Sequence, residues 1–283
     1  SEKYGYIIPE SGENVSKVKE FKEKPDVETA KKYLAQSALW NAGIFAFKLG
    51  YLLDKAHSMI DFEDYRDLFN KYDTLTKISF DYAVVEKESS IQVLRYSGDW
   101  KDVGTLGSYW EANMELIDII PEFNLYEEFW KIYTNSEILP PQYISAQSVI
   151  ERSIICNGAE VYGEVHNSII GSGVIIGEGS VIRDSIIMKD TRVGKNCVMD
   201  KAIIAENCLV GDNTTFGIGS DIPNKLKPAI YSFGLVAVGE KSVIPDGVQI
   251  GKNTAISGVT SKEDYPNGVL ESGETLIKAG ERA

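Results

Sequence analysis

The chain has 283 residues, of which 43% are hydrophobic and 25% are charged, and its formal net charge at pH 7 is −13. This length supports two domains with separate cores, and the acidic balance excludes general affinity for nucleic acid or anionic membrane. No apolar run approaches the roughly 20 residues that a membrane-spanning helix needs. We expect a cytoplasmic protein, in agreement with three cysteines that lack a Cys-x-x-Cys spacing.

The first hundred residues alternate between strand-like and helix-like segments. Strands are expected at residues 4–8, 15–22, 40–47 and 91–96, and helices from Asp26 to about Leu34, over 49–60 and 62–72, and from Ser79. Asp26 and Ser79 are typical helix N-caps. This alternation predicts an α/β layer with parallel strand pairing. Only about three strands precede the run at residues 91–96 that leads to Trp100, which is few for an open sheet with a ligand crevice.

Residues 100–105, with the sequence Trp-Lys-Asp-Val-Gly-Thr, join this layer to the rest of the chain. Asp102 follows a strand-like run and precedes Gly104, a position where open α/β sheets place ligand chemistry. Asp102 is therefore a candidate metal-holding residue. The alternative is that Asp102 and Thr105 only cap the helix that begins there.

A 17-residue repeat fills most of the second half. Successive copies begin at Ile169, Ile186 and Ile203, and in each copy an aliphatic residue recurs every five or six positions with glycine, asparagine or aspartate between. This spacing is typical of short strands wound around a triangular coil. We predict a left-handed parallel β-helix over residues 136–283, after a first domain over residues 1–135.

Three further features are an insertion in the second half and the two histidines of the chain. An insertion at residues 220–235 contains Lys225, Lys227 and Pro228, and it is either an anion-binding effector loop or, more commonly, a plain surface loop. His57 follows a helical pattern and is expected on a helix surface. His166 lies in a turn between two apolar runs.

Three motifs, in this order and followed by hexapeptide rungs, resemble the sugar-1-phosphate nucleotidyltransferases. They are residues 21–25 (Phe-Lys-Glu-Lys-Pro), 40–45 (Trp-Asn-Ala-Gly-Ile-Phe) and 100–105. The stretch from Thr105 through residues 108–114, 125–126 and 140–144 is similar to bacterial glucose-1-phosphate adenylyltransferases. Residues 4–7, 40–43 and 79–84 are more similar to mannose-1-phosphate guanylyltransferases.

The resemblance implies the C-terminal part of a mixed, Rossmann-like nucleotidyltransferase sheet followed by the β-helix. It assigns Glu23 and Lys24 to the sugar phosphate, places Asn41 and Gly43 along the sugar site, and puts Asp81 nearby. Asp102 would hold Mg²⁺, and Lys24 and Asp102 would be the catalytic residues. The implied reaction joins ATP and glucose 1-phosphate into ADP-glucose and pyrophosphate, as in glycogen biosynthesis, with GTP and mannose 1-phosphate as the alternative pair.

The sequence also departs from this family. It contains no glycine-rich loop of the form Gly-Gly-x-Gly-x-Arg-Leu and no second metal-binding aspartate in the first half of the sheet. We expect an incomplete part of a longer enzyme that does not turn over alone, and a homo-oligomer built through apolar solenoid faces. Two alternatives are a regulatory subunit without catalysis and a β-helix acyltransferase with His166 as its base. Retention of Lys24 and Asp102 argues against the first.

Overall fold

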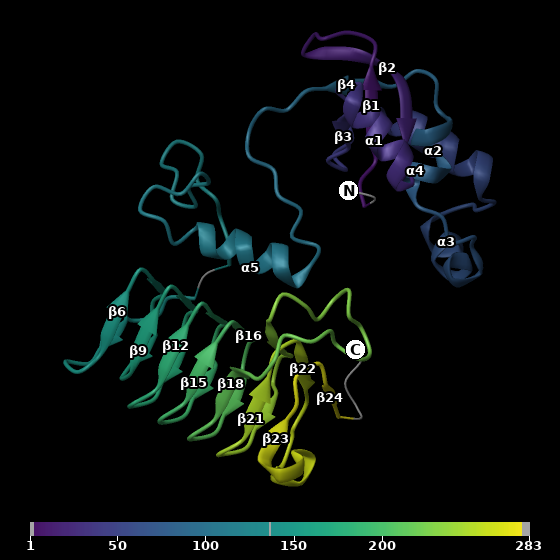
Figure 1. Cartoon of the computed structure of the whole chain (residues 1–283). Coiled ribbons are helices and arrows are strands. Elements are labelled where there is room, and N and C mark those ends of the chain that lie inside the picture. The colour runs from purple at the N-terminus through teal and green to yellow at the C-terminus, as the bar shows by residue number, and fades with distance from the viewer. Residues whose placement is uncertain (1–2, 136, 279–283) are drawn as a thin grey trace. The chain divides into compact units, whose positions relative to one another are not determined.

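A computed structural model describes residues 3–135 and 137–278 of the chain. The chain forms two compact units, Ser1–Trp100 and Lys101–Ala283 (Figure 1). The predicted boundary between residues 135 and 136 separates a nucleotidyltransferase-like catalytic part from the β-helix. This boundary stays a prediction. Among the described residues, no helix is both long and apolar enough to cross a membrane.

The first unit is built on a four-stranded sheet with the order β3-β1-β2-β4. Its strands are β1 (Tyr6–Pro9), β2 (Val15–Lys22), β3 (Leu39–Trp40) and β4 (Gln92–Leu94). Each neighbouring pair is antiparallel, so the predicted parallel pairing is wrong. Antiparallel strands need only a tight turn, whereas parallel strands need a crossover of a dozen or more residues. The five residues between β1 and β2 allow only the former.

Helices occur where the sequence predicts them, and those expected after Asp26 and Ser79 have these residues as N-caps. They are α1 (Val27–Ala35), α2 (Leu49–Met59), α3 (Tyr65–Lys71) and α4 (Phe80–Ala83), with short 3₁₀ turns at Tyr72–Thr74 and Val85–Lys87. The Asp26 carboxylate accepts from the Thr29 backbone N–H at 2.9 Å. The α1 helix packs on β1, where Tyr6, Ile8, Ala30 and Tyr33 form a small buried core.

The predicted strand over residues 40–47 is mostly wrong. Only Leu39 and Trp40 pair with β1, and residues 41–48 contain no regular structure. The Asn41 backbone N–H still donates to the Gly5 carbonyl at 2.8 Å. Gly43 then adopts a φ of +70°, a left-handed conformation that turns the chain away from the sheet.

The second unit begins with α5 (Leu106–Glu115) and continues as a parallel β-solenoid with three sheets of seven, six and seven strands. The first sheet contains β7 (Ile154–Ile155), β10 (Ile169–Ile170), β13 (Ile186–Ile187), β16 (Ala202–Ile204), β19 (Val236–Val238), β22 (Thr254–Ser257) and β24 (Thr275–Ile277). The second contains β5 (Tyr143–Ile144), β8 (Glu160–Val161), β11 (Ile175–Ile176), β14 (Arg192–Val193), β17 (Leu209–Val210) and β20 (Val243–Ile244). The third contains β6 (Val149–Glu151), β9 (Glu164–His166), β12 (Val181–Arg183), β15 (Val198–Asp200), β18 (Thr215–Ile218), β21 (Gln249–Gly251) and β23 (Val269–Leu270). Short 3₁₀ turns at Lys262–Asp264 and Pro266–Gly268 precede β23.

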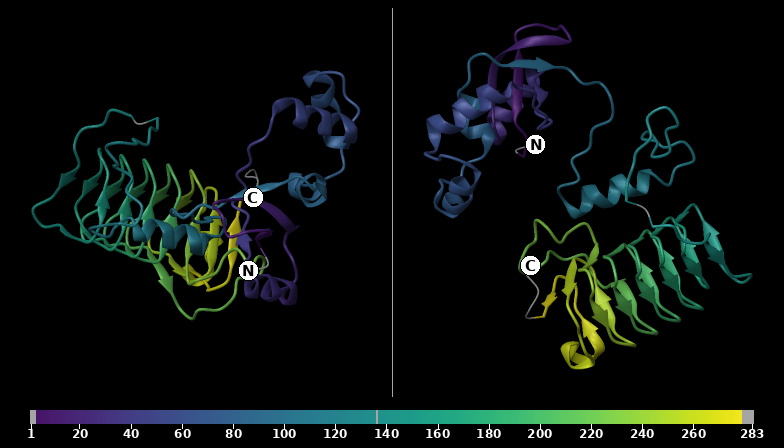
Figure 2. Two further views of the ribbon diagram at one scale, coloured as in Figure 1. Left: turned by 90° about the horizontal axis from the view of Figure 1, so that it is seen from above. Right: turned by 180° about the vertical axis from the view of Figure 1, so that it is seen from behind.

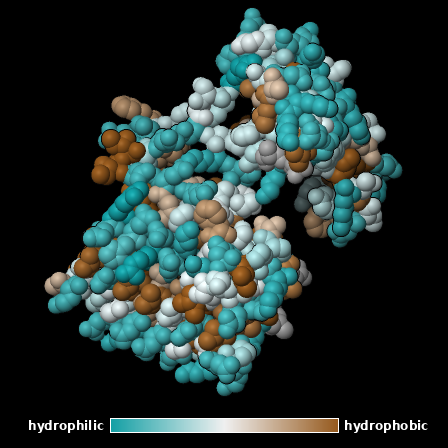
Figure 3. Space-filling model, in the orientation of Figure 1, coloured by the Kyte–Doolittle hydropathy of each residue, from teal (hydrophilic) through white to brown (hydrophobic). Residues whose placement is uncertain are grey.

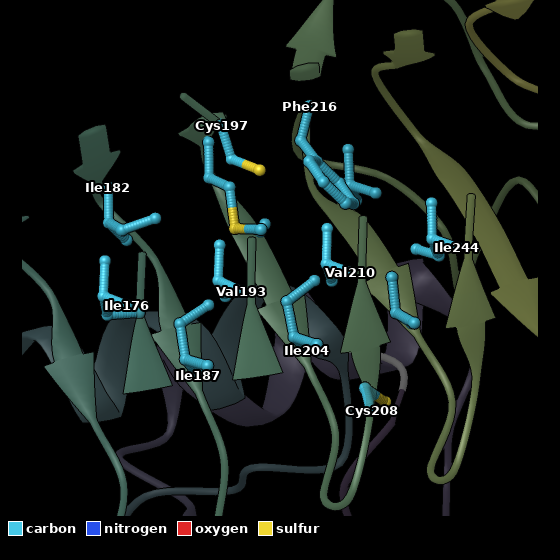
Figure 4. Close-up of a cluster of buried hydrophobic side chains, with 14 of the residues drawn as sticks. Ile176, Ile182, Ile187, Val193, Cys197, Ile204, Cys208, Val210, Phe216 and Ile244 are labelled. Carbon is cyan, nitrogen blue, oxygen red and sulfur yellow. The ribbon is translucent and has the colours of Figure 1, made fainter. Parts of the chain in front are cut away.

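The solenoid core repeats with the predicted period. Ile170 pairs with Ile187, and Ile187 pairs with Ile204, in parallel strands 17 residues apart. Figure 4 shows inward side chains such as Ile182 and Phe216 filling the coil. The predicted parallel β-helix is confirmed as a parallel solenoid, and its left-handed sense stays a prediction.

The segment that links α5 to the solenoid exposes large apolar side chains. Ile119, Phe129 and Trp130 are between 84% and 101% exposed. In Figure 3 apolar side chains gather over the loop that follows α5. Residues 119–135 contain no helix or strand, so this segment contributes little to either core.

Candidate functional site

Five of the predicted site residues lie close together in the first unit. Glu23 and Lys24 follow β2, while Asn41 and Gly43 follow β3. β1 lies between β2 and β3 and is antiparallel to both. The C-terminal ends of β2 and β3 therefore lie next to each other, on the same side of the sheet. The α4 helix brings Asp81 to this edge, where the Asn41 amide nitrogen donates to the Asp81 carboxylate at 3.0 Å.

Glu23 is the chemically unusual member of this group. Its side chain is nearly buried, and its Oε1 lies 3.2 Å from Lys24 Nζ. Its Oε2 is buried and has no hydrogen-bond partner among the described residues. An unpartnered buried carboxylate oxygen is costly for the folded protein. It is also a strong acceptor for a donor such as a sugar hydroxyl.

Gly5 makes room for the Glu23 carboxylate. A Cβ atom at Gly5 would lie 2.5 Å from Glu23 Oε2 and 3.1 Å from Asn41 Cβ. Sequence reasoning missed Gly5 as a site residue, although this glycine stands between two tyrosines in a β-strand pattern, which signals a close approach. It also missed Tyr82, whose hydroxyl lies 3.5 Å from the Glu23 carbonyl oxygen.

The Asn41 side chain links two segments of the site through hydrogen bonds. Its side-chain nitrogen donates to Asp81, and its side-chain oxygen accepts from the Gly43 backbone N–H at 3.0 Å. The amide therefore ties α4 to the segment after β3. This arrangement fixes the segment beside Glu23, and the lining role of Asn41, Gly43 and Asp81 stays a prediction.

Lys24 supplies the positive charge. Its side chain is 53% exposed, so the ammonium group is accessible from solvent. Its backbone has a φ of +44°, an uncommon conformation for a residue with a side chain. A mobile cation beside a buried carboxylate is a suitable arrangement for a ligand with both a phosphate and hydroxyl groups.

Asp102 belongs to the second unit, which begins at Lys101. The residue is exposed, and its Oδ1 accepts from the Gly104 backbone N–H at 2.8 Å. The helix cap is Thr105, whose hydroxyl accepts from the Ser108 N–H at 3.1 Å. Asp102 thus shapes the turn before α5, while Thr105 alone caps the helix.

Asp102 fits Mg²⁺ as a single ligand. Among the described residues, no cluster of three or more histidine, cysteine, aspartate or glutamate side chains could hold a metal ion. Mg²⁺ is usually bound through one or two carboxylates with substrate phosphates and water completing its shell. One exposed carboxylate is compatible with that pattern, but it is not a complete site.

An open cavity of about 570 Å³ lies elsewhere in the first unit. Its lining includes Phe45, Phe47, Phe80, Tyr51 and Glu88, and none of the predicted site residues. Hydrogen bonds from Tyr51, Lys55 and Ser90 lower the pKa of Glu88 to about 2. The cavity walls combine apolar and polar side chains, and Lys48 is one of the lining residues.

The two histidines lie on the solenoid and on α2. Both ring nitrogens of His166 face carboxylates, with Nδ1 2.9 Å from Glu151 and Nε2 3.2 Å from Glu164. A histidine held in this way has no free nitrogen to act as a base, which argues against the acyltransferase alternative. His57 lies in α2 and stacks on Phe62.

The insertion at residues 220–235 is anchored to the solenoid. Lys225 forms an ion pair with Glu274, and the buried Asn224 donates to the Asn253 carbonyl at 2.9 Å. The effector role of this loop stays a prediction.

Comparison with known proteins agrees with the two-part architecture. Residues 1–119 match the nucleotidyl transferase family, and residues 141–227 match the GlmU-like C-terminal hexapeptide family. The chain belongs to the nucleotidyl transferase family and has a hexapeptide C-terminal part.

The similar curated proteins are glucose-1-phosphate adenylyltransferases. The protein from Lachnospira eligens is 54% identical over 280 residues, which covers 99% of this chain and 62% of that protein. The protein from Thermotoga maritima is 45% identical over 92% of this chain and 59% of its own length. For Acetivibrio thermocellus the identity is 37%, over 70% of this chain and 46% of that protein. The chain thus spans about half to three fifths of the length of these relatives.

Proposed function

We propose that the group around Glu23 and Lys24 binds a sugar 1-phosphate. The observation that carries this proposal is the buried Oε2 of Glu23, which has no hydrogen-bond partner among the described residues, beside the half-exposed Lys24 side chain. A sugar hydroxyl would donate to the carboxylate, and the phosphate would pair with the lysine. Asn41, Gly43 and Asp81 would line the sugar.

We propose further that the protein carrying this chain transfers an adenylyl group from ATP to glucose 1-phosphate. A phosphate oxygen of the sugar phosphate attacks the α-phosphorus of ATP, the bond to the β-phosphate breaks, and ADP-glucose and pyrophosphate form. Such transfer depends mainly on positioning and charge neutralisation. Lys24 would hold the attacking phosphate group. Asp102 would be a ligand of Mg²⁺, which supplies charge neutralisation when bound.

The choice of glucose and ATP rests on the names of the similar curated proteins. Mannose 1-phosphate with GTP is the alternative pair. Because these 283 residues contain no Gly-Gly-x-Gly-x-Arg-Leu sequence, the proposal for this chain alone is sugar phosphate binding without turnover. We also propose that the protein is a homo-oligomer, and that it binds neither nucleic acid nor membranes.

Isothermal titration of this chain with glucose 1-phosphate tests the proposed sugar site. Lys24→Ala should weaken binding by about tenfold or more, because a charged hydrogen bond contributes about 1.5–3 kcal/mol. The control is Lys19→Ala, which removes an exposed lysine of β2 and should bind as the wild type does. Equal affinity in the wild type and Lys24→Ala would refute the assignment.

A further inference from the structure

One outer face of the solenoid is apolar and covered. Ile186 and Ile203 point outward from β13 and β16, yet they are only 3% and 5% exposed, because α5 packs on them (Figure 1). The helix contributes Leu106, Tyr109, Trp110 and Met114 to this contact, and Ile117 follows just after the helix ends. Their spacing of three or four residues places them on one face of the helix.

Apolar packing alone does not fix where α5 lies along the solenoid. The outward isoleucines recur once in each coil, about every 4.8 Å, whereas a helical turn rises about 5.4 Å. A column of identical side chains therefore selects the buried face of the helix but favours no single position along the axis. Directional contacts are needed to set that position.

A column of corner residues supplies these contacts. Arg152, Asp184 and Lys201 occupy equivalent corners of the coil, and each has a positive φ. Arg152 lies 2.5 Å from the Asp118 carboxylate, and the Asp184 carbonyl accepts from the Trp110 indole N–H at 2.6 Å. The Lys201 ammonium lies 5.1 Å from the centre of the Trp110 ring.

These contacts match the dimensions of both elements. Asp118 lies three residues beyond the end of α5, and eight residues of helical path, the separation of Trp110 and Asp118, would rise about 12 Å. The corners that these two residues contact are two to three coils apart, or about 10–14 Å. The contacts of Trp110 within the helix and of Asp118 just beyond it thus hold α5 in one position along the solenoid.

The insertion completes the arrangement around Lys201. Its ammonium lies 4.8 Å from the centre of the Phe233 ring, so the cation contacts two aromatic rings whose centroids are 5.9 Å apart. Figure 2 shows the insertion beside the N-terminal end of α5. Phe233 has a φ of +68°, which is rare for a bulky residue. The next residue, Gly234, donates to the buried side chain of Asn253 at 2.7 Å, and this bond holds Phe233 in place.

The position of α5 also sets the position of Asp102. The Asp102 carboxylate accepts from the Gly104 N–H, and the next residue, Thr105, forms a reciprocal capping box with Ser108 in the first turn of the helix. Lys101 forms an ion pair with Glu115 at the other end of α5. Short hydrogen-bonded links therefore connect the carboxylate to the helix.

We propose that Lys201 is a positioning residue. Through its contacts with the rings of Trp110 and Phe233, it fixes α5 along the solenoid and thereby places the Asp102 carboxylate for nucleotidyl transfer. This inference rests on the proposed function of Asp102. It gives the insertion a structural task, which is to present Phe233 to Lys201.

A double-mutant cycle in the full-length protein tests this inference. Lys201→Gln should lower kcat by about tenfold and leave the KM for glucose 1-phosphate unchanged, because small displacements of a reacting group have large effects on rate. Adding Lys201→Gln to Asp102→Asn should cause no further loss, because both changes act through the same carboxylate. Lys201→Arg keeps a cation that stacks on aromatic rings and should restore kcat. Lys195→Gln, an exposed solenoid lysine, should behave as the wild type.

Hydrogen exchange of the α5 amides provides a readout that does not depend on activity. Lys201→Gln should increase exchange over residues 106–115 by about tenfold, and Lys195→Gln should not. Unchanged exchange and unchanged kcat in Lys201→Gln would overturn the inference, as would fully additive losses in the double variant. If Asp102→Asn alone has no effect on kcat, then the proposed role of Asp102 has failed instead.

Discussion

At the scale of single residues, the candidate site depends on a glycine that leaves space for a carboxylate. Gly5→Ala would bring a methyl group to within 2.5 Å of Glu23 Oε2, so the carboxylate or the strand must move. We expect the free energy of unfolding to fall by about 1–3 kcal/mol, as for other overpacked sites, together with weaker glucose 1-phosphate binding. Urea denaturation and titration calorimetry measure the two effects.

Gly12→Ala is the matched control for this prediction. Apart from its chain neighbours, no atom of the described residues lies within 4 Å of a Cβ at Gly12, so this variant should keep both stability and binding. If Gly5→Ala binds glucose 1-phosphate as tightly as the wild type, then Glu23 is not part of the binding site.

The unpartnered oxygen of Glu23 predicts opposite effects on stability and on binding. Glu23→Gln removes a nearly buried charge and should raise the free energy of unfolding by about 1 kcal/mol. The same change should weaken sugar phosphate binding, because a neutral amide accepts a hydrogen bond less strongly than a carboxylate. Loss of stability with unchanged binding would indicate a purely structural glutamate.

At the scale of elements, the solenoid concentrates its stability in inward side chains. Phe216 in β18 is 1% exposed and belongs to the continuous core. Phe216→Ala should lower the free energy of unfolding by about 3–5 kcal/mol. Leu209→Ala, at an outward position that is 48% exposed, should have a much smaller effect. Thermal and urea unfolding of both variants measure this difference, and equal losses would contradict the inward and outward assignment.

The contacts of His166 predict a pH-dependent stability of the first coils. Hydrogen bonds to Glu151 and Glu164 raise the pKa of His166 above its ordinary value of 6.5. A raised pKa in the folded state stabilises the protein fully below about pH 6.5, and this contribution is lost as the pH rises through the folded-state pKa. The urea midpoint should therefore fall between about pH 6 and pH 9 by more in the wild type than in His166→Gln.

His57→Gln is the control for this titration, because His57 contacts Phe62 rather than a carboxylate. This variant should keep the wild-type dependence on pH. If His166→Gln shows the same decrease as the wild type, then the paired carboxylates do not determine the pKa of His166 as described.

At the scale of the whole molecule, local patterns predicted more than long-range ones. The 17-residue repeat predicted the solenoid because each coil pairs only with its neighbours, as the register of Ile170 with Ile187 confirms. The parallel pairing predicted for the first unit was wrong, because strand direction depends on which strands become neighbours. The strand predicted at residues 40–47 was wrong for a local reason. The chain turns at Gly43, and the prediction gave more weight to the apolar residues around this glycine than to the glycine itself.

The sequence predicted which residues form the candidate site but not how their side chains contact one another. The resemblance named Glu23, Asn41 and Asp81, and these residues do lie together because β1 separates β2 from β3. The hydrogen bond from Asn41 to Asp81 also requires α4 to lie beside the end of β3, and no local pattern specifies either the strand order or this contact. The contact between Lys201 and Trp110 joins residues far apart in the sequence and could not be predicted either.

Pyrophosphate release by the full-length protein is the measurement that tests the central claim most directly. ATP or GTP would be paired with glucose 1-phosphate or mannose 1-phosphate, in the wild type, Lys24→Ala and Asp102→Asn. We predict release with ATP and glucose 1-phosphate, a raised KM for the sugar phosphate in Lys24→Ala, and a kcat lowered by about a hundredfold in Asp102→Asn. Preference for GTP and mannose 1-phosphate would instead indicate a mannose-1-phosphate guanylyltransferase. No release from any pair would contradict the proposed function and favour a regulatory subunit.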